Sequence, residues 1–191
     1  IKRDLFAALD EAVESPTAIL ASNTSSIPIT QIAAATSRPG SVVGMHFYNP
    51  AQNRPLEDVI ATEVSDPDQV NRAADFASGV LGKTVVRAQD RAGFIVNKLL
   101  CPYIFEAIRM LEEGFATRED IDAAMVNGAG YPMGPLTLAD LIGNDTMLAV
   151  SEAFMQEYQD PRYAAPPLLR RMVEAGLLGR KAGRGFYDYD A

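Results

Sequence analysis

The 191 residues include 25 acidic and 17 basic side chains, which gives a net charge of −8, and 48% of the residues are hydrophobic. This composition is typical of a globular protein and lacks the basic surface of a nucleic-acid-binding protein, and no apolar run reaches the roughly 18 residues of a membrane-spanning helix. A single cysteine, Cys101, excludes an internal disulfide framework and favours a reducing, cytoplasmic location.

Helical and strand signals alternate through the first half of the chain. Apolar residues at helical spacing, including Phe6 and Leu9, predict a helix at the start. Asp66 and Pro67 suit the first turn of another helix, because Asp caps free N–H groups and Pro fits the first helical position. The pattern predicts helices over 1–13, 28–36 and 67–81, and strands over 18–22, 42–48, 56–61 and 83–88. This order is typical of an α/β domain with a mostly parallel sheet.

From Gly93 onward the pattern changes to helices. Thr117 to Asp120 resembles a capping box, and Gly143-Asn144 predicts a break within a long helical stretch. The predicted helices cover 94–114, 117–125, 136–158 and 166–178. The fold class is therefore α/β followed by all-α.

His46 is the only histidine and lies near the end of the predicted strand over 42–48. One interpretation is a hydrogen-bonded structural residue. A catalytic role is favoured because ligands of open parallel sheets bind at the carboxyl ends of strands, and because Glu57 and Asp58 follow on the next strand. A carboxylate bound to one imidazole nitrogen leaves the other nitrogen free to take a proton. One histidine and one cysteine far apart in sequence predict no metal site.

The run Ser22-Asn23-Thr24-Ser25-Ser26 follows the predicted strand over 18–22. One interpretation is a helix cap, because Ser and Asn favour that position. The other is a polar rim that binds an anion or a carbonyl group, because the run stands at the carboxyl end of a strand and before a helix N-terminus.

Five segments, in the same order and at similar spacing, resemble the L-3-hydroxyacyl-CoA dehydrogenase family. They are Ala21-Ser22-Asn23-Thr24-Ser25-Ser26, Gly44-Met45-His46-Phe47-Tyr48-Asn49-Pro50, Gly93-Phe94-Ile95-Val96-Asn97, Gly128-Ala129-Gly130-Tyr131-Pro132-Met133-Gly134-Pro135 and Gly185-Phe186-Tyr187. Together they cover essentially the whole chain, and the tail over 178–189 looks most like the bacterial 3-hydroxybutyryl-CoA branch. The resemblance implies NAD-dependent oxidation of a (S)-3-hydroxyacyl-CoA by a homodimer, with NADP as the alternative cofactor.

The resemblance also implies catalytic and substrate-binding residues. His46 corresponds to the base that takes the 3-hydroxyl proton while a hydride leaves C3. Ser25 corresponds to a serine that contacts both substrate and cofactor. Asn97 corresponds to an amide that helps to hold the substrate, and a helix cap is its competing interpretation.

On the cofactor side, the resemblance implies Lys2, Ser25, Asn49 and Lys181. Lys2 and Lys181 match lysines that reach NAD, and Asn49 supports the corner around the substrate amide. For Lys181 a solvated surface charge is an equally good interpretation.

The carboxylate that would orient His46 departs from the family pattern. The family has Glu in a Lys-Leu-Val-Glu-Val-Ile run, and an ungapped comparison puts Asp58 at that position. Asp is one methylene shorter than Glu. Glu57 has the family's side chain, but alternation along a strand points it to the opposite face. We therefore favour Asp58 as the catalytic partner of His46, with Glu57 second.

The dinucleotide fingerprint Gly-x-Gly-x-x-Gly does not occur in the 191 residues. Its glycines let the backbone approach the pyrophosphate at a helix N-terminus. Ile1 lies inside a helical pattern, and the resemblance places it after the family's first βαβ units. We expect residues 1–92 to be the C-terminal part of an NAD-binding Rossmann domain, and 93–191 to be an all-helical domain for substrate binding and dimerisation.

Two functions from different classes follow. The favoured one is NAD-dependent oxidation of an acyl-CoA substrate, 3-hydroxybutyryl-CoA above all, by a chain that is truncated and inactive as given. The alternative is a catalytically silent remnant that keeps only the dimerisation and binding module. The missing fingerprint and the Asp at position 58 are the features that favour the alternative.

Overall fold

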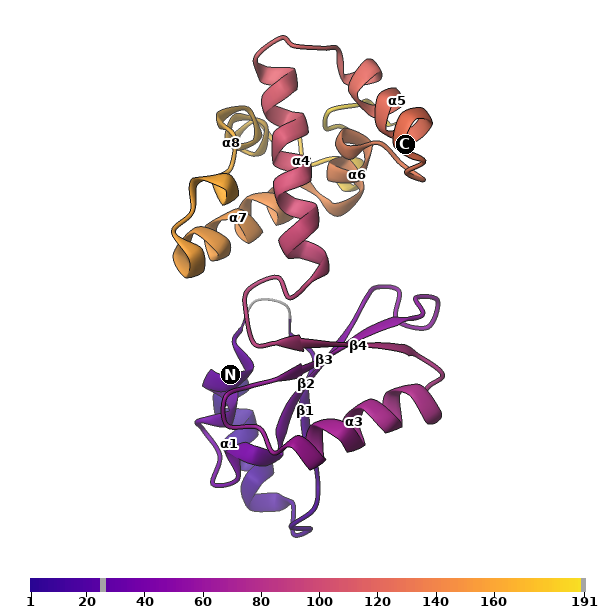
Figure 1. The fold of residues 1–191 in the computed structure, drawn as a ribbon. Coiled ribbons are helices and arrows are strands. Elements are labelled where there is room, and N and C mark those ends of the chain that lie inside the picture. Colours follow the sequence, from indigo (N-terminus) through magenta and orange to yellow (C-terminus); the bar gives the residue numbers. More distant parts are fainter. Residues whose placement is uncertain (25–26, 190–191) are drawn as a thin grey trace. The chain divides into compact units, whose positions relative to one another are not determined.

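The computed structural model describes residues 1–24 and 27–189, which fall into two compact units, Ile1–Ile95 (unit 1) and Val96–Ala191 (unit 2). Unit 1 contains helices α1 (Lys2–Ala12), α2 (Ile29–Ala33) and α3 (Pro67–Gly79), and strands β1 (Leu20–Ser22), β2 (Val42–Phe47), β3 (Leu56–Ala61) and β4 (Thr84–Gln89) (Figure 1). Unit 2 contains α4 (Val96–Glu112), α5 (Arg118–Ala129), α6 (Pro135–Ile142), α7 (Asn144–Tyr158) and α8 (Pro167–Glu174). The α/β fold followed by helices is thereby confirmed.

The four strands of unit 1 form one sheet in the order β1-β2-β3-β4. β1 pairs parallel with β2, and β3 parallel with β4, but β2 and β3 are antiparallel. Only residues 48–55 connect β2 to β3. A parallel pair needs a crossover of about a dozen residues or more, so this connection is too short for one and β3 turns back beside β2.

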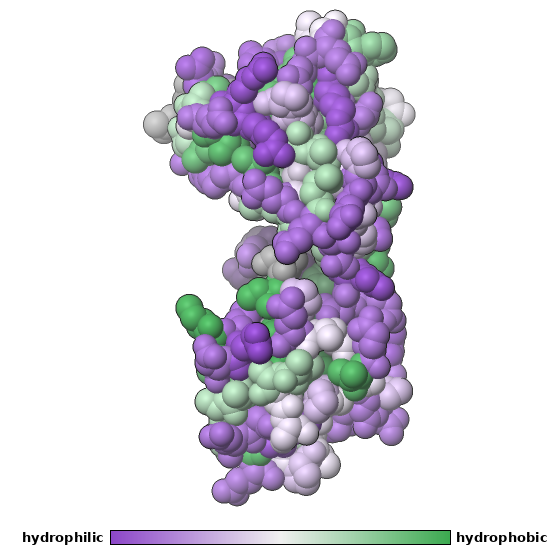
Figure 2. All heavy atoms as spheres, turned by 90° about the vertical axis from the view of Figure 1, so that its left-hand side faces the viewer, coloured by the Kyte–Doolittle hydropathy of each residue, from purple (hydrophilic) through white to green (hydrophobic). Residues whose placement is uncertain are grey.

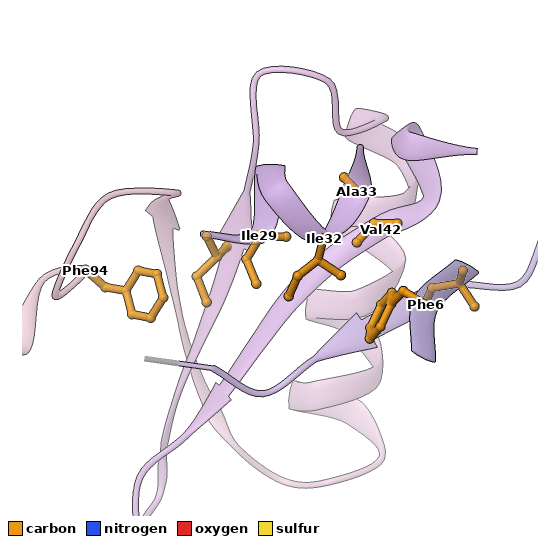
Figure 3. Packing of buried hydrophobic residues seen from close by; sticks show 8 residues of the cluster. Phe6, Ile29, Ile32, Ala33, Val42 and Phe94 are labelled. Carbon is orange, nitrogen blue, oxygen red and sulfur yellow. The ribbon is translucent and has the colours of Figure 1, made fainter. Parts of the chain in front are cut away.

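Side chains alternate across the sheet and create two apolar layers. On one face, Val42 and Ile60 pack against Ile29 and Ile32 of α2, together with Phe6 of α1 (Figure 3). On the other face, the two strands pack against the apolar side of α3. This layer consists of Val43, Met45 and Val59 of the strands and Val70, Ala73, Ala74 and Ala77 of α3. The sheet of unit 1 is therefore covered by helices on both faces, which leaves strand ends as positions for polar side chains.

The helices α3 and α5 begin with the side-chain caps that their sequences predict. Asp66 accepts a hydrogen bond from the backbone N–H of Asp68 at the start of α3, and Thr117 accepts one from Asp120 at the start of α5. α2 has no such local cap. Its first N–H groups donate instead to the carboxylate of Asp90, which lies about sixty residues further along the chain.

In unit 2, α4 lies between the other helices and supplies the centre of the core (Figure 1). Ile104, Phe105 and Ile108 of α4 are fully buried, as is Leu169 of α8. Cys101 lies on the same helix, is 3% exposed, and has its thiol pKa raised to about 12 by burial. α4 is therefore a core helix, and its cysteine remains a protonated thiol at neutral pH.

Two buried carboxylates organise the rest of unit 2. Asp122 of α5 accepts hydrogen bonds from the N–H groups of Leu136 and Thr137 and so caps α6. Asp140 of α6 accepts from the N–H groups of Phe186 and Tyr187. The C-terminal segment is thus held by a carboxylate rather than by a sheet, and up to residue 189 it forms only isolated β-bridges, such as Arg184 with Asp188.

The side of the molecule in Figure 2 carries mostly hydrophilic residues, with small separate groups of hydrophobic ones. Among the described helices, none combines the length and apolar character needed to cross a membrane.

Candidate active site

His46 is the penultimate residue of β2, and the antiparallel register places it directly opposite Asp58 of β3. His46 Nδ1 lies 3.3 Å from Asp58 Oδ2. His46 is 8% exposed and Asp58 is fully buried. Directly opposed residues have Cβ atoms roughly 5 Å apart, so the strand pairing itself brings imidazole and carboxylate together.

Tyr48 completes this cluster. Its hydroxyl donates a hydrogen bond of 2.6 Å to Asp58 Oδ2, the same oxygen that faces His46. Burial is the main cause that raises the pKa of Tyr48 above its ordinary value of 10, and the hydrogen bond to Asp58 adds to it. Tyr48 is therefore a protonated donor at neutral pH.

Aromatic rings flank the imidazole. The ring of Tyr48 meets that of His46 edge-on at a centroid distance of 4.9 Å, and the ring of Phe94 lies 5.2 Å away at a tilt. Phe94 is itself 8% exposed and has a positive φ of 45°. The rings exclude water from much of the imidazole, which strengthens its interaction with Asp58.

Lys2 is the first residue of α1, and its ammonium group reaches the end of β1. Lys2 Nζ donates to the carbonyl oxygen of Asn23 at 2.6 Å and lies 3.5 Å from Ser22 Oγ. Asn23 in turn accepts a 3.4 Å hydrogen bond from the backbone N–H of Phe47, next to His46. Lys2 is thereby linked through Asn23 to the strand end that carries the histidine.

Asn49 and Ser25 are the other two residues of unit 1 that the sequence predicts for the site. Asn49 is exposed in the connection after β2, and its peptide bond to Pro50 is cis. Ser25 lies outside the described residues, so its predicted contacts with substrate and cofactor stay predictions.

Asn97 and Lys181 belong to unit 2. Asn97 is the second residue of α4 and is half-buried. Lys181 forms an ion pair with Asp145 of α7, at 2.5 Å from Oδ1, and this interaction lowers the pKa of Asp145. The charge of Lys181 is therefore engaged by a carboxylate of its own unit.

Glu57 lies on the opposite face of β3 from Asp58, on the side that packs against α3. It is fully buried, and both carboxylate oxygens lack a hydrogen-bond partner among the described residues. Burial raises the pKa of Glu57, Lys83 opposes the rise, and Asp58 adds to it. In this structure the carboxylate next to His46 is that of Asp58.

Tyr48 was not among the candidate residues from sequence. Its position in Val42 to Pro50 offered a signal, because strand alternation puts residues 46 and 48 on the same side. The hydrogen bond itself depends on how the chain leaves β2 after Phe47, which no short motif specifies.

Two family models match the chain and together cover nearly all of it. The model of the 3-hydroxyacyl-CoA dehydrogenase NAD binding domain matches residues 1–91, and that of the 3-hydroxyacyl-CoA dehydrogenase C-terminal domain matches residues 93–189. The chain belongs to the 3-hydroxyacyl-CoA dehydrogenase family. The resemblance seen in the five sequence segments is thereby confirmed.

Curated members of the family are similar along the full chain. The 3-hydroxybutyryl-CoA dehydrogenase of Mycobacterium tuberculosis is 54% identical over 189 residues, which are 99% of this chain and 66% of that protein. The human mitochondrial hydroxyacyl-coenzyme A dehydrogenase is 44% identical over 190 residues, 99% of this chain and 60% of that protein. The chain therefore spans about 60–66% of the length of these two relatives.

Two solved structures with clear sequence similarity share the fold of this chain. The crystal structure of M. tuberculosis FadB2 has a TM-score of 0.95 at 54% identity, covering 99% of this chain and 66% of that one. The (S)-3-hydroxybutyryl-CoA dehydrogenase PaaH1 of Ralstonia eutropha has a TM-score of 0.94 at 45% identity, covering 100% and 66%.

Proposed function

We propose that the protein oxidises the 3-hydroxyl of (S)-3-hydroxyacyl-CoA, above all 3-hydroxybutyryl-CoA, to the 3-oxo compound with NAD. The observation that carries the proposal is the contact of 3.3 Å between His46 and the buried Asp58 at the carboxyl end of β2. Membership of the family supports the choice of reaction, and the similar 3-hydroxybutyryl-CoA dehydrogenases of M. tuberculosis and R. eutropha support the choice of substrate.

His46 is the proposed general base. A carboxylate that accepts from Nδ1–H fixes the tautomer in which Nε2 carries the free lone pair. Nε2 can then take the proton of the 3-hydroxyl group, and the neighbouring negative charge of Asp58 stabilises the imidazolium that forms. Asp58 is thus a positioning residue that also supplies charge.

NAD, when bound, supplies the acceptor for the hydride that leaves C3 of the substrate. The residues at the end of β1 fit part of such a cofactor, because the ammonium of Lys2 has three donors and two neighbouring oxygens, which leaves capacity for an oxygen of a ligand. We propose Lys2, Ser25 and Asn49 as cofactor contacts in unit 1, with NADP as the alternative cofactor. Lys181 is the proposed contact from unit 2.

For the substrate we propose Ser25 and Asn97 as contacts, because a hydroxyl and an amide offer donors to a carbonyl or hydroxyl oxygen. We propose that residues 1–92 are the C-terminal part of an NAD-binding Rossmann domain and that residues 93–191 are a helical domain for substrate binding and dimerisation. The 191 residues contain no Gly-x-Gly-x-x-Gly, so we propose that they do not hold the pyrophosphate by themselves and are inactive alone.

The first test is oxidation of NADH by the protein expressed from its complete coding region, with acetoacetyl-CoA as substrate. Turnover is expected, and His46→Gln should reduce kcat at least about 100-fold, because the general base is lost. The 191 residues expressed alone should show no turnover. A complete protein without turnover, or a His46→Gln variant as active as the wild type, contradicts the proposal.

A matched pair of variants tests the carboxylate. Asp58→Ala should reduce kcat about 100-fold, whereas Glu57→Ala should change it little, because only Asp58 faces His46. Both residues are fully buried and adjacent in β3, so each variant controls for the general effect of a change in that strand. Small and equal effects would exclude the pair of His46 and Asp58 from catalysis.

A further inference from the structure

The carboxylate of Asp58 is shared unequally between two donors. Tyr48 makes the shorter contact, 2.6 Å to Oδ2, and His46 Nδ1 the longer one, 3.3 Å to the same atom. Typical N–H···O hydrogen bonds measure about 2.7–3.2 Å, so the contact with His46 is the weaker of the two. Asp58 Oδ1 has no hydrogen-bond partner within the described residues. The tyrosine is therefore the group that holds Asp58 in place.

We propose that Tyr48 is a positioning residue for the reaction: its hydroxyl holds Asp58 under the ring of His46 and limits how strongly that carboxylate supports the imidazolium. The proposal rests on the proposed function of His46 as general base. Two donors on one carboxylate oxygen compete for the same negative charge, so each weakens the other's hydrogen bond. Tyr48 contacts His46 directly as well, through its ring edge.

Tyr48 and Asp58 are titratable side chains in direct contact with the ring of His46. Tyr48 directly follows β2, and β3 contributes Asp58, whose charge also raises the pKa of Glu57 on the other face of the strand. The neighbour that follows β4 is the uncharged Phe94. Lys83 hydrogen-bonds two carbonyl groups of the connection after β2, those of Ala51 and Arg54, and acts on Glu57.

The test is Tyr48→Phe in the protein expressed from its complete coding region, which keeps the ring and removes the hydroxyl. Asp58 Oδ2 is then available to His46 alone, so the pKa of His46 should rise by roughly half a pH unit to one pH unit. It is measured by NMR titration of the imidazole signal that disappears in His46→Gln. The acidic limb of the kcat/KM profile should move to higher pH by the same amount, a change that a purely structural role of Tyr48 would not produce.

Tyr103→Phe is the matched control. Tyr103 is another half-buried tyrosine, it lies in unit 2, and its hydroxyl has no hydrogen-bond partner in the part of the chain that the structure describes. Removal of that hydroxyl should leave the titration of His46 unchanged.

Asp58→Asn shows whether the effect passes through the carboxylate. In that background Tyr48→Phe should no longer move the pKa of His46, because the shared negative charge is gone. The proposal is overturned if the pKa of His46 is the same in the wild type and in Tyr48→Phe, or if the shift persists in the Asp58→Asn background. Absence of turnover in the wild type would overturn the proposed function separately, since the titration is read without substrate.

Discussion

Glu57 and Asp58 show how two neighbouring carboxyl groups acquire different properties in one strand. Both are fully buried. Asp58 accepts a hydrogen bond from Tyr48 and faces His46, whereas neither oxygen of Glu57 has a partner among the residues described. A buried polar group without a partner costs free energy, roughly 1–3 kcal/mol, and more if it is charged. Glu57 is therefore expected to oppose folding at neutral pH.

Glu57→Gln should stabilise the protein at neutral pH. The pKa of Glu57 is raised in the folded state above its ordinary value of 4.5, so its protonated form favours folding only at low pH. That contribution is fully present below about pH 4.5 and is lost as the pH rises toward the folded-state pKa. We expect Glu57→Gln to raise the free energy of unfolding by about 1–2 kcal/mol at pH 8 and by much less at pH 4.5. Urea unfolding at both pH values measures the difference.

Glu11→Gln is the control, because Glu11 is exposed on α1. Its effect should stay within about 0.5 kcal/mol at both pH values. If Glu57→Gln is no more stabilising at pH 8 than at pH 4.5, the pKa of Glu57 is not raised in the folded protein.

The sequence was sufficient to separate these two carboxylates but not to find Tyr48. Alternation along β3 follows from backbone geometry alone, so the opposite faces of Glu57 and Asp58 could be predicted. The hydrogen bond from Tyr48 depends on the path of residues 48–55. That path is set by distant groups such as Lys83, which hydrogen-bonds the carbonyl groups of Ala51 and Arg54.

At the scale of the elements, α6 is involved with two carboxylates. Asp122 of α5 caps its first turn, and its own Asp140 anchors the C-terminal segment. Asp140 of α6 accepts hydrogen bonds of 2.9 Å from the N–H groups of both Phe186 and Tyr187. Gly185 has no room for a side chain, since a Cβ there would lie 1.9 Å from Asp140 Oδ1. The residue after Arg184 must therefore be glycine for the segment to reach its anchor.

Asp140→Ala should release this segment. Loss of the acceptor leaves two backbone N–H groups without their partner, and we expect the free energy of unfolding of unit 2 to fall by about 2–4 kcal/mol. Hydrogen exchange at the amides of Phe186 and Tyr187 should become at least about 100-fold faster. Asp145→Ala removes a half-exposed carboxylate of the neighbouring helix and should cost less than about 1 kcal/mol. Unchanged exchange in Asp140→Ala would show that Asp140 is not the anchor.

The sequence predicts the start of a helix well where the capping residue lies within the helix's own first turn. Asp66 and Thr117 stand at the starts of α3 and α5 as predicted, because a cap needs only residues within one turn. The cap of α2 by Asp90 could not be predicted, since it joins residues far apart in the chain. The antiparallel turn between β2 and β3 could have been, because residues 48–55 are too few for a crossover.

At the scale of the whole molecule, an acidic protein is proposed to bind acidic ligands and a second copy of itself. The net charge of −8 on these 191 residues would repel an acyl-CoA and a dinucleotide at long range, so the proposed binding would depend on local cations such as Lys2. For the proposed homodimer, unit 2 offers exposed apolar side chains, including Leu99 at 71% and Phe115 at 77% exposure. Large exposed apolar side chains are typical of association surfaces when they occur together.

Leu99→Glu should weaken the proposed dimer. A charge placed in an apolar interface is costly, so the dissociation constant should rise at least about tenfold, equivalent to ~1.4 kcal/mol. Sedimentation velocity across a dilution series measures it. Phe76→Glu is the control, because Phe76 is an exposed apolar residue of unit 1. A protein that sediments as a monomer at all concentrations, or equal effects of both variants, contradicts dimerisation through unit 2.

The burial of Cys101 makes the chain convenient to label. A thiol that is 3% exposed and protonated at neutral pH reacts slowly with maleimides, which require an accessible thiolate. Cysteines introduced at exposed positions 76 and 115 would therefore take up fluorophores with little background from position 101. Energy transfer between a dye on each unit would then report the distance between them in solution, with and without ligand.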